Sequence, residues 1–273
     1  MSTEKYEKEI KKIAKMIFES KFAIILSGAG ISTESGIPDF RGPDGLWTKL
    51  GDDPMDVASI ASFRRMSLMG ASDDMMNMIT SLVQTLITAR PNKAHKAIGK
   101  LYKKGYIKAC ITQNIDGLHQ RGGCKEVVEV HGTYKTATCQ NCFKKYTFEF
   151  LVQKVLEDGQ FPPSCDCQGI IKPDAIFFGE SLPKHALYQA MSYSNKTDLM
   201  IVVGSSLVVY PIAEAPSIAK SNNAKLVIIN LEPTPYDSQA DVLIRGKLGE
   251  ILPKILEEVE NLEKQEADIK TKT

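Results

Sequence analysis

Five short apolar runs recur along the chain, and each is followed at once by glycine or polar residues. The runs are residues 22–26, 107–111, 127–130, 199–203 and 226–229. Segments with helical spacing separate them, beginning with residues 4–19, where Ile10, Ile13 and Ile17 recur three or four positions apart. Alternation of buried strands with helices is typical of a doubly wound parallel sheet, so the sequence predicts an α/β, Rossmann-like fold.

The residues that follow these runs carry the polar groups of the expected site. They are Ser27-Gly28, Gln113-Asn114, His131-Gly132, Gly204-Ser205-Ser206 and Asn230-Leu231-Glu232. In open parallel sheets, ligands bind outside the carboxyl ends of the strands. We therefore expect these five segments to meet at one edge of the sheet.

The loop after the first run has features of a phosphate-binding turn. Gly28-Ala29-Gly30 lets the backbone approach an anion closely, and the N–H groups that follow point toward it. The dinucleotide fingerprint Gly-x-Gly-x-x-Gly is incomplete, because Thr33 occupies the third glycine position. A plain tight turn is therefore the alternative interpretation of this loop.

Three further side chains favour a ligand at this loop. They are Asp39, Phe40 and Arg41, an acid, an aromatic ring and a cation in succession. The Arg41 guanidinium can hold a phosphate through two hydrogen bonds, and Phe40 can cover an aromatic ring.

Composition excludes several classes of protein. The net charge of +1, with 25% charged residues, gives no broad field for nucleic acid or anionic membrane. No apolar run approaches the roughly 20 residues of a membrane span, and the N-terminus lacks the pattern of a secretory signal. The sequence therefore predicts a cytoplasmic protein without a membrane partner or direct nucleic-acid binding.

The 273 residues suffice for one large domain, and we find no internal repeat or low-complexity linker. We expect a single domain, 1–273, with two lobes and a charged, frayed tail at 265–273. The large lobe comprises 1–42, 93–132 and 178–264, and the small lobe comprises 43–92 and 133–177. A Met-rich amphipathic helix at about 75–89 is expected to present a core face, or alternatively an adaptable surface near a pocket.

Four of the six cysteines are closely spaced within residues 133–177. They form Cys139-x-x-Cys142 and, after 22 residues, Cys165-x-Cys167. Cys110 lies in an apolar run and Cys124 in a Gly-rich loop, so we interpret both as bystanders.

Taken together, these residues resemble the sirtuin family of NAD-dependent protein-lysine deacylases. The matching motifs, in order, are Gly-Ala-Gly-Ile-Ser (28–32), Gly-Ile-Pro-Asp-Phe-Arg-Gly (36–42), Thr-Gln-Asn-Ile-Asp-Gly-Leu-His (112–119), His-Gly (131–132), Phe-Phe-Gly-Glu (177–180), Gly-Ser-Ser (204–206) and Asn-Leu-Glu (230–232). Each motif alone is modest, but their order and spacing over about residues 8–260 are highly specific.

The resemblance implies a binding site for NAD across the sheet edge. Its phosphates would lie on the Gly28 turn with Arg41, Ser205 and Ser206. Residues Asn230 to Glu232 would meet the adenosine ribose, with Lys247 or Leu248 near the adenine. Ile115 and Asp116 would hold the nicotinamide carboxamide, while Ala29 and Phe40 would wall the ring.

The resemblance also implies the catalytic residues. His131 would be the general base that deprotonates a ribose hydroxyl, since an imidazole has a pKa near working pH. Asn114 would orient the ribose or a water, and Gln113 would contact the ribose. The products would be free lysine, nicotinamide and O-acyl-ADP-ribose. His95, His119 and His185 are interpreted as structural.

Protein substrates carrying an acylated lysine are the implied partners. The substrate peptide would add as a strand between two segments, Phe178-Gly179-Glu180 and Val208-Val209-Tyr210. Backbone hydrogen bonds would then dominate, and side-chain specificity would be loose. The sequence leaves the oligomeric state open, and a monomer is compatible with it.

The chain departs from the family pattern in two places. The family's structural zinc site usually has two Cys-x-x-Cys pairs, whereas Cys165-x-Cys167 is one residue shorter. Tetrahedral zinc bound by Cys139, Cys142, Cys165 and Cys167 is the favoured interpretation. A strained site, or three thiolates with another ligand, is the alternative.

The second departure concerns the acyl group. Family members that prefer succinyl or malonyl lysine carry Tyr-x-x-Arg on the insertion helix, but Ile79 and Leu82 lie near those positions here. We therefore expect acetyl or longer apolar acyl groups.

Three other functions are weighed against a deacylase. A conventional Rossmann dehydrogenase would have the third glycine and an acid about 20 residues after the turn, and the chain has neither. Mono-ADP-ribosyl transfer to protein would use the same bond cleavage with another acceptor. A non-catalytic sensor of NAD or O-acyl-ADP-ribose would not need His131 or Asn114.

Overall fold

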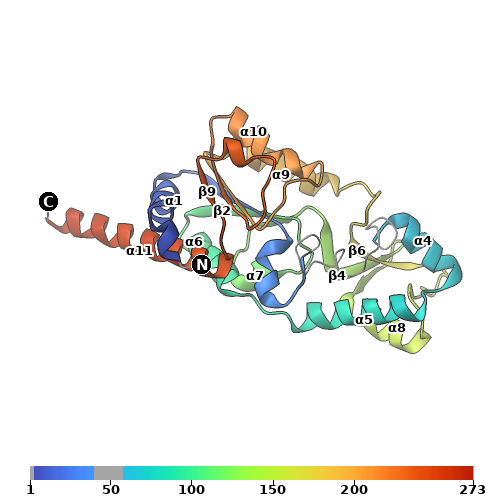
Figure 1. The fold of residues 1–273 in the computed structure, drawn as a ribbon. Coiled ribbons are helices and arrows are strands. Elements are labelled where there is room, and N and C mark those ends of the chain that lie inside the picture. Colours follow the sequence, from blue (N-terminus) through green and yellow to red (C-terminus); the bar gives the residue numbers. More distant parts are fainter. Residues whose placement is uncertain (1–2, 40–57, 273) are drawn as a thin grey trace.

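The computed structural model describes residues 3–39 and 58–272. Its centre is a six-stranded parallel sheet in the order β3-β2-β1-β7-β8-β9 (Figure 1). The strands are β1 (Ala23–Ser27), β2 (Ile107–Thr112), β3 (Val127–Glu129), β7 (Leu199–Val203), β8 (Lys225–Ile229) and β9 (Val242–Ile244). The predicted doubly wound α/β fold is confirmed.

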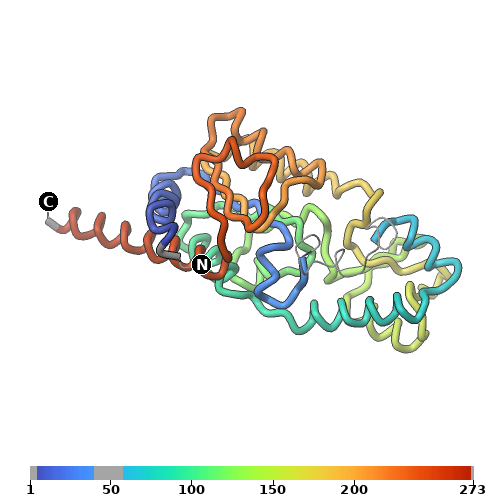
Figure 2. The backbone as a smooth tube through the Cα atoms, viewed as in Figure 1, coloured from blue at the N-terminus to red at the C-terminus, as the bar shows by residue number. Residues whose placement is uncertain are grey.

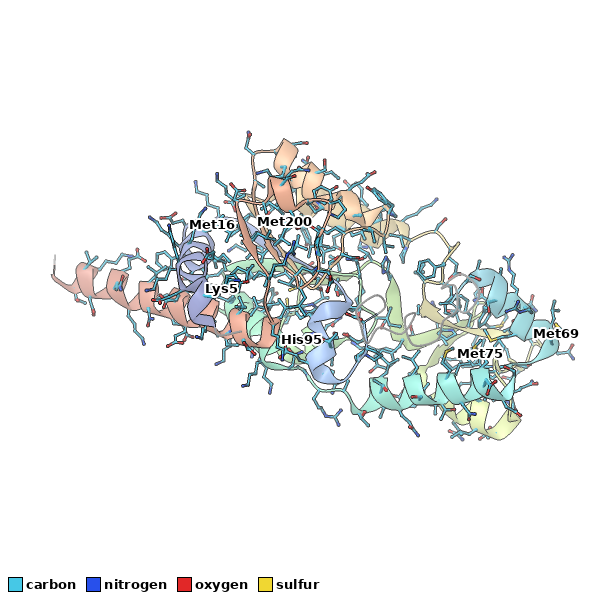
Figure 3. The ribbon with its side chains drawn as sticks, viewed as in Figure 1. Lys5, Met16, Met69, Met75, His95 and Met200 are labelled. Carbon is cyan, nitrogen blue, oxygen red and sulfur yellow. The ribbon has the colours of Figure 1, made fainter. Side chains whose placement is uncertain are left out.

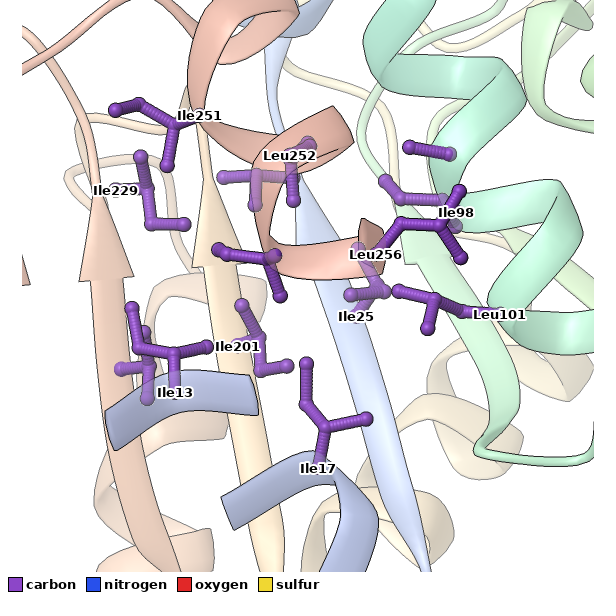
Figure 4. Packing of buried hydrophobic residues seen from close by; sticks show 14 of the residues in the cluster. Ile13, Ile17, Ile25, Ile98, Leu101, Ile201, Ile229, Ile251, Leu252 and Leu256 are labelled. Atoms are coloured by element: carbon purple, nitrogen blue, oxygen red, sulfur yellow. The ribbon is translucent and has the colours of Figure 1, made fainter. Parts of the chain in front are cut away.

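Helices cover both faces of this sheet, which is why its central strands are apolar throughout. One face carries α1 (Glu7–Glu19), α6 (Lys93–Lys103) and α11 (Leu248–Lys272), and the other carries α9 (Lys184–Lys196) and α10 (Ala215–Ser221). Figure 4 shows Ile17 and Leu256 from the helices packed onto Ile25 and Ile201 from the strands. Burial on both sides of β1 and β7 explains their five consecutive buried residues.

The strand order positions the site. The chain proceeds from β1 outward to β2 and β3, and then returns to β7 on the opposite side of β1. This reversal between β1 and β7 is the topological switch point, where a crevice opens at the carboxyl ends of the strands. The turns after β1 and β7 therefore form the floor of the expected site.

A smaller antiparallel sheet lies at the end of the molecule away from the C-terminus (Figures 1 and 2). Its order is β5-β4-β6, with β4 (Gly132–Cys139), β5 (Lys145–Thr147) and β6 (Ile171–Ala175). Helices α4 (Ile60–Met69), α5 (Asp73–Thr88) and α8 (Phe148–Asp158) lie in the same part of the molecule. The lobe boundaries drawn from the sequence stay a prediction.

The remaining described elements are short. They are α7 (Leu118–Gly122) and the 3₁₀ helices η1 (Thr3–Tyr6), η2 (Ala29–Ile31), η3 (Thr33–Ser35), η4 (Ile212–Glu214) and η5 (Asp237–Gln239). None of the described helices combines the length and apolar character that crossing a membrane requires.

Two helices differ from the expectation. In α5 only Leu86 is buried, so its Met-rich face is a partly covered flank rather than a core face. Helix α11 continues to Lys272, although we expected a frayed tail at 265–273. The tail contains no glycine or proline, and Glu266 pairs with Lys270 at 2.8 Å, which supports continued helix.

Candidate active site and cysteine cluster

The turn after β1 packs backbone against backbone on the turn after β7. The Gly28 N–H donates to Val203 O at 3.1 Å, and the Gly30 N–H donates to Gly204 O at 2.9 Å. A Cβ atom at Gly28 would lie 2.7 Å from Gly204 O, and one at Gly30 would lie 2.9 Å from Gly204 Cα. These two glycines are therefore required by the close approach of the turn after β7. Their contact with a phosphate stays a prediction.

A cavity of about 120 Å³ opens beside this turn. Its lining is Gly30, Thr33, Glu34, Gly204, Asn230, Leu231, Gly246, Lys247 and Leu248. The cavity thus brings together residues from four separate segments that the sequence assigned to one cofactor site. Lys247 and Leu248 belong to this lining although they lie at the start of α11.

Glu34 is a residue of this cavity that the sequence reasoning missed. Its Oε1 accepts the Gly249 N–H at 2.8 Å, so the carboxylate caps the first turn of α11. The two residues are 215 positions apart, and no local pattern links them. Nearby, Asn230 Nδ2 donates to Glu232 O at 2.7 Å, and Arg245 donates to the backbone oxygens of both residues.

The segment after β2 lies against the Gly28 turn. Asn114 Nδ2 donates to Gly28 O at 3.0 Å and to Ser32 Oγ at 3.2 Å. Gln113 Nε2 donates to Ser205 Oγ at 2.7 Å. Residues that follow β1, β2 and β7 are therefore joined by side-chain hydrogen bonds, as the shared sheet edge predicts.

Asp116 is held within this segment by two hydrogen bonds. Its Oδ2 accepts the Ser32 hydroxyl at 2.6 Å, and its Oδ1 accepts the Leu118 N–H at 2.8 Å. The side chain is 4% exposed, and burial raises its pKa while these hydrogen bonds act in the opposite direction. Ser32 was quoted in a motif but not assigned to the site, and the structure places it between Asn114 and Asp116.

His131 follows β3 and borders the same segment. Its Nδ1 lies 3.0 Å from Gln113 O, which can only accept, so Nδ1 carries the proton and Nε2 keeps its lone pair. Burial lowers the pKa of His131, and the Gln113 carbonyl only partly offsets this. The ring is therefore neutral at pH 7 and has a basic nitrogen, the state that a general base requires.

The other three histidines do not join this site. His95, labelled in Figure 3, and His119 are buried with their ring centroids 5.1 Å apart. His119 Nε2 lies 2.8 Å from Ser27 Oγ, inside the sheet edge rather than in the cavity. His185 is exposed on α9. The structural interpretation agrees with the buried positions of His95 and His119, whereas His185 lies on the surface and not in the core.

Six further residues were expected to contact NAD, and the structure describes four of them. Ala29 begins η2, and Ile115 accepts the Tyr134 N–H at 3.3 Å. Asp39 and Ser206 are half-buried. Phe40 and Arg41 lie outside the described residues.

The four spaced cysteines converge despite the shortened second pair. Their four Sγ atoms lie within 4.8 Å of one another, with Cys139 and Cys167 3.5 Å apart and Cys142 and Cys165 3.7 Å apart. A zinc ion with bonds of about 2.3 Å to sulfur has S–S edges of about 3.8 Å, so this donor set fits tetrahedral zinc. The four cysteines can therefore complete a tetrahedral zinc site without a fifth residue as a substitute ligand.

Local backbone geometry explains how the short pair closes. Gln168 has φ +62°, and the Cys165 N–H donates to Gly169 O at 2.7 Å, which folds the chain tightly around the pair. A Cβ at Gly169 would lie 2.7 Å from Cys139 Sγ, so only glycine fits there. The other two cysteines, Cys110 and Cys124, form a separate buried pair.

The two segments expected to hold a peptide have accessible groups. Gly179 is exposed at φ +85°, and Val208 and Tyr210 are 44% and 64% exposed. Phe178 forms a parallel bridge with Ser59, which ties this segment to the start of α4. Val209 and Glu180 are half-buried.

Comparisons with known proteins agree with this geometry. Residues 28–211 match the model of the Sir2 family. NAD-dependent protein deacylase 2 of Archaeoglobus fulgidus is 46% identical, over 94% of this chain and 98% of the relative. A solved structure of Sir2 with a p53 peptide and NAD⁺ is 40% identical, with a TM-score of 0.82, over 92% of this chain and 99% of the other.

A second solved structure, Sir2Tm bound to a propionylated peptide, is 39% identical with a TM-score of 0.81. It covers 92% of this chain and 98% of the other. The glycine turn, the Gln113–Asp116 segment, His131 and the four-cysteine cluster therefore occur in a chain that matches these proteins along nearly its whole length, and the chain belongs to the Sir2 family.

Proposed function

We propose that this protein is an NAD-dependent protein-lysine deacylase that removes acetyl and longer apolar acyl groups. The observation that carries the proposal is the placement of His131. The imidazole ring is held by the Gln113 carbonyl and keeps a basic Nε2. Gln113 and Asn114 in turn donate hydrogen bonds to Ser205 and to the Gly28 turn. A simple nucleotide sensor does not need a neutral histidine held in this way, and a conventional dehydrogenase would have the third glycine that Thr33 replaces.

The residues divide the chemistry among themselves. The cavity beside Gly30 would take the adenosine half of NAD, with Asn230 in its lining to meet the ribose. Asp116 is fixed by Ser32 and the Leu118 amide, so its carboxyl can orient the nicotinamide carboxamide.

When bound as co-substrate, NAD would supply the ribose carbon C1′, to which the acyl oxygen of the lysine substrate would bond as nicotinamide leaves. His131 Nε2 would accept the proton of a ribose hydroxyl, which allows that oxygen to attack the acyl carbon. The bond from this carbon to the lysine nitrogen would then break to release free lysine, and one water would add to the same carbon and leave the acyl group on a single ribose oxygen. Asn114, anchored on Gly28 O and Ser32 Oγ, restricts the ribose or an attacking water to one position. The products are free lysine, nicotinamide and O-acyl-ADP-ribose.

Zinc held by the four cysteines has a structural role in this proposal. The four thiolates complete a tetrahedron, so no coordination position is left for a substrate. A thiolate cluster is also kept reduced in the cytosol, which supports a cytoplasmic location. Cell fractionation tests that location.

The acyl preference follows from α5. Ile79 on this helix is half-buried and Leu82 is 40% exposed, and α5 contains no lysine, arginine or tyrosine. An acidic acyl tail would find no cation on this helix, whereas an apolar tail would find methionine and isoleucine side chains. Efficient desuccinylation by the pure protein would contradict this preference.

The test uses NAD with an acetyl-lysine peptide, followed by mass spectrometry of all products. The proposal predicts equal amounts of nicotinamide, deacetylated peptide and O-acetyl-ADP-ribose. Transfer of label from NAD to a protein acceptor would instead indicate ADP-ribosyl transfer, and an absorbance change at 340 nm would indicate hydride transfer. A matched succinyl-lysine peptide serves as the control for acyl preference.

A further inference from the structure

Strand β6 connects three features of the molecule. Its residue Ile171 pairs with Cys139 of the cysteine cluster, and the Ile176 N–H just beyond the strand donates to His131 O at 2.9 Å. The chain then enters the turn Phe177–Glu180, which contains the segment Phe178–Glu180 that the family resemblance assigns to peptide binding. A residue on β6 can therefore act on the peptide turn without touching substrate.

Lys172 on this strand is a buried cation whose donors are all used. The residue is 5% exposed, and its Nζ lies 2.9 Å from Glu180 Oε2, 2.8 Å from Ala175 O and 3.1 Å from Pro173 O. An ammonium group has three donors, and these are its three acceptors. Nζ also lies 4.4 Å from the centroid of the Phe177 ring, close enough for a cation–π contact.

The Glu180 carboxylate, which pairs with Lys172, also closes the Phe177–Glu180 turn. The Oε2 atom of Glu180 that faces Lys172 also accepts the Phe177 N–H at 2.8 Å. The Glu180 N–H donates back to Phe177 O at 3.0 Å, and Gly179 between them has φ +85°. The ammonium, the carboxylate and the turn backbone thus form one connected network.

The far side of the turn is also anchored. The Ile60 N–H donates to Phe178 O at 2.9 Å, and the Phe178 N–H donates to Ala58 O at 3.0 Å. The Phe177 ring contacts the Phe63 ring with centroids 5.4 Å apart. Phe178 is therefore held from α4, whereas Glu180 is held from β6.

We propose that Lys172 is a positioning residue, which fixes the Phe177–Glu180 turn in the conformation that accepts the substrate strand. This rests on the proposed function, because a lysine deacylase must bind an acyl-lysine peptide, and the family resemblance places that peptide at Phe178–Glu180. A buried ion pair contributes little net stability compared with apolar residues of similar volume, and its better-supported use is to specify one arrangement. The acceptors of the Lys172 ammonium are Pro173, Ala175 and Glu180, so the arrangement that it specifies is the path of the chain from β6 into the turn.

The first test is kinetic and compares Lys172→Met with Lys145→Met. Lys145 is the matched control, because it lies in the same small sheet but is largely exposed. Its amine contacts Asp174 at 3.4 Å and Thr138 at 2.7 Å, and neither residue belongs to the turn. We expect Lys172→Met to raise the KM for an acetyl-lysine peptide about 10- to 100-fold, since a misplaced binding group costs on this scale. The KM for NAD should change less than about threefold, and Lys145→Met should leave both near wild type.

A double variant tests whether Lys172 acts through Glu180. If it does, Lys172→Met with Glu180→Gln raises the peptide KM no further than Lys172→Met alone, because both remove the same link. Multiplied effects in the double variant would contradict a shared network. Lys172→Arg keeps a cation and is expected to recover part of the peptide affinity.

Amide hydrogen exchange supplies a readout that needs no activity. We expect Lys172→Met to speed exchange in residues 176–181, while residues 132–139 and the zinc content stay as in wild type. Faster exchange throughout the small sheet, or equal rises in both KM values, would show a merely structural role and overturn the proposal. So would an unchanged turn with an unchanged peptide KM.

The two proposals fail in different ways. Absence of peptide-dependent nicotinamide release from the wild type would contradict the deacylase function. Exchange in residues 176–181 would still decide whether Lys172 fixes the turn.

Discussion

Mild acid should destabilise this protein through the buried pair His95 and His119. The two residues are 0% and 1% exposed, with ring centroids 5.1 Å apart. Burial lowers the pKa of His119 to about 4, and burial together with the charge of His119 lowers the pKa of His95 to about 2. His95 Nε2 and His119 Nδ1 have no hydrogen-bond partner among the described residues, so a proton on either would be poorly solvated.

The sign and size follow from the difference between folded and unfolded states. Both folded pKa values lie below the unfolded value of about 6.5, so the unfolded chain binds more protons once the pH falls through 6.5. The stability that the neutral rings contribute is present above that pH and is lost below it. Between pH 7 and pH 5 each ring accounts for a loss of about 2 kcal/mol, and the pair for about 4 kcal/mol.

Urea unfolding at pH 7 and pH 5, for wild type and His95→Phe, measures this loss. Phenylalanine keeps the ring volume but cannot titrate, while it loses the 3.0 Å contact of His95 Nδ1 with Asn92 at both pH values. Comparing each protein with itself across pH removes that constant cost. We expect the variant to lose about 2 kcal/mol less than wild type. Equal losses in the two proteins would refute the assignment of the pH effect to this pair.

Three further predictions concern the site. Gly30→Ala should raise the KM for NAD at least about tenfold in steady-state assays, because its Cβ would lie 2.9 Å from Gly204 Cα; an unchanged KM would contradict the close-packed turn. Cys167→Ser should reduce zinc content, measured by mass spectrometry, and lower Tm, and full zinc retention would favour a three-thiolate site. Since burial lowers the pKa of His131, kcat/KM should decrease in acid with a midpoint below pH 6.5. A midpoint above pH 7 would exclude His131 as the group that titrates.

The large sheet could be predicted because its signals are local. Apolar runs such as 199–203 bury both faces, and the glycines that follow them report close backbone approach. Once parallel strands are inferred, their carboxyl ends must share an edge. The convergence of Gln113, Asn114 and Ser205 therefore followed from sequence order alone.

The small lobe gave weaker signals. Strand β6 includes Lys172, Pro173 and Asp174, which show no apolar alternation. Its register depends on pairing with β4. Helix α4 was not predicted at all. The Met-rich pattern of α5 predicted a core face, but periodicity identifies an apolar side without showing how completely a neighbour covers it.

Long-range polar contacts were the least predictable part of the site. Glu34 meets Gly249 across 215 positions, and Lys172 is recognisable as buried only once the turn at Glu180 is placed. Nothing in the residues around either one indicates its partner. Such contacts depend on the finished fold, so only the structure reveals them.

The most direct test of the account is nicotinamide release from NAD with and without an acetyl-lysine peptide, in wild type and His131→Ala. The account predicts peptide-dependent release by wild type and a loss of about 10²- to 10⁴-fold in the variant, with Tm little changed. Release that needs no peptide, or a variant as active as wild type, would contradict the assignment of His131 as the general base of a lysine deacylase.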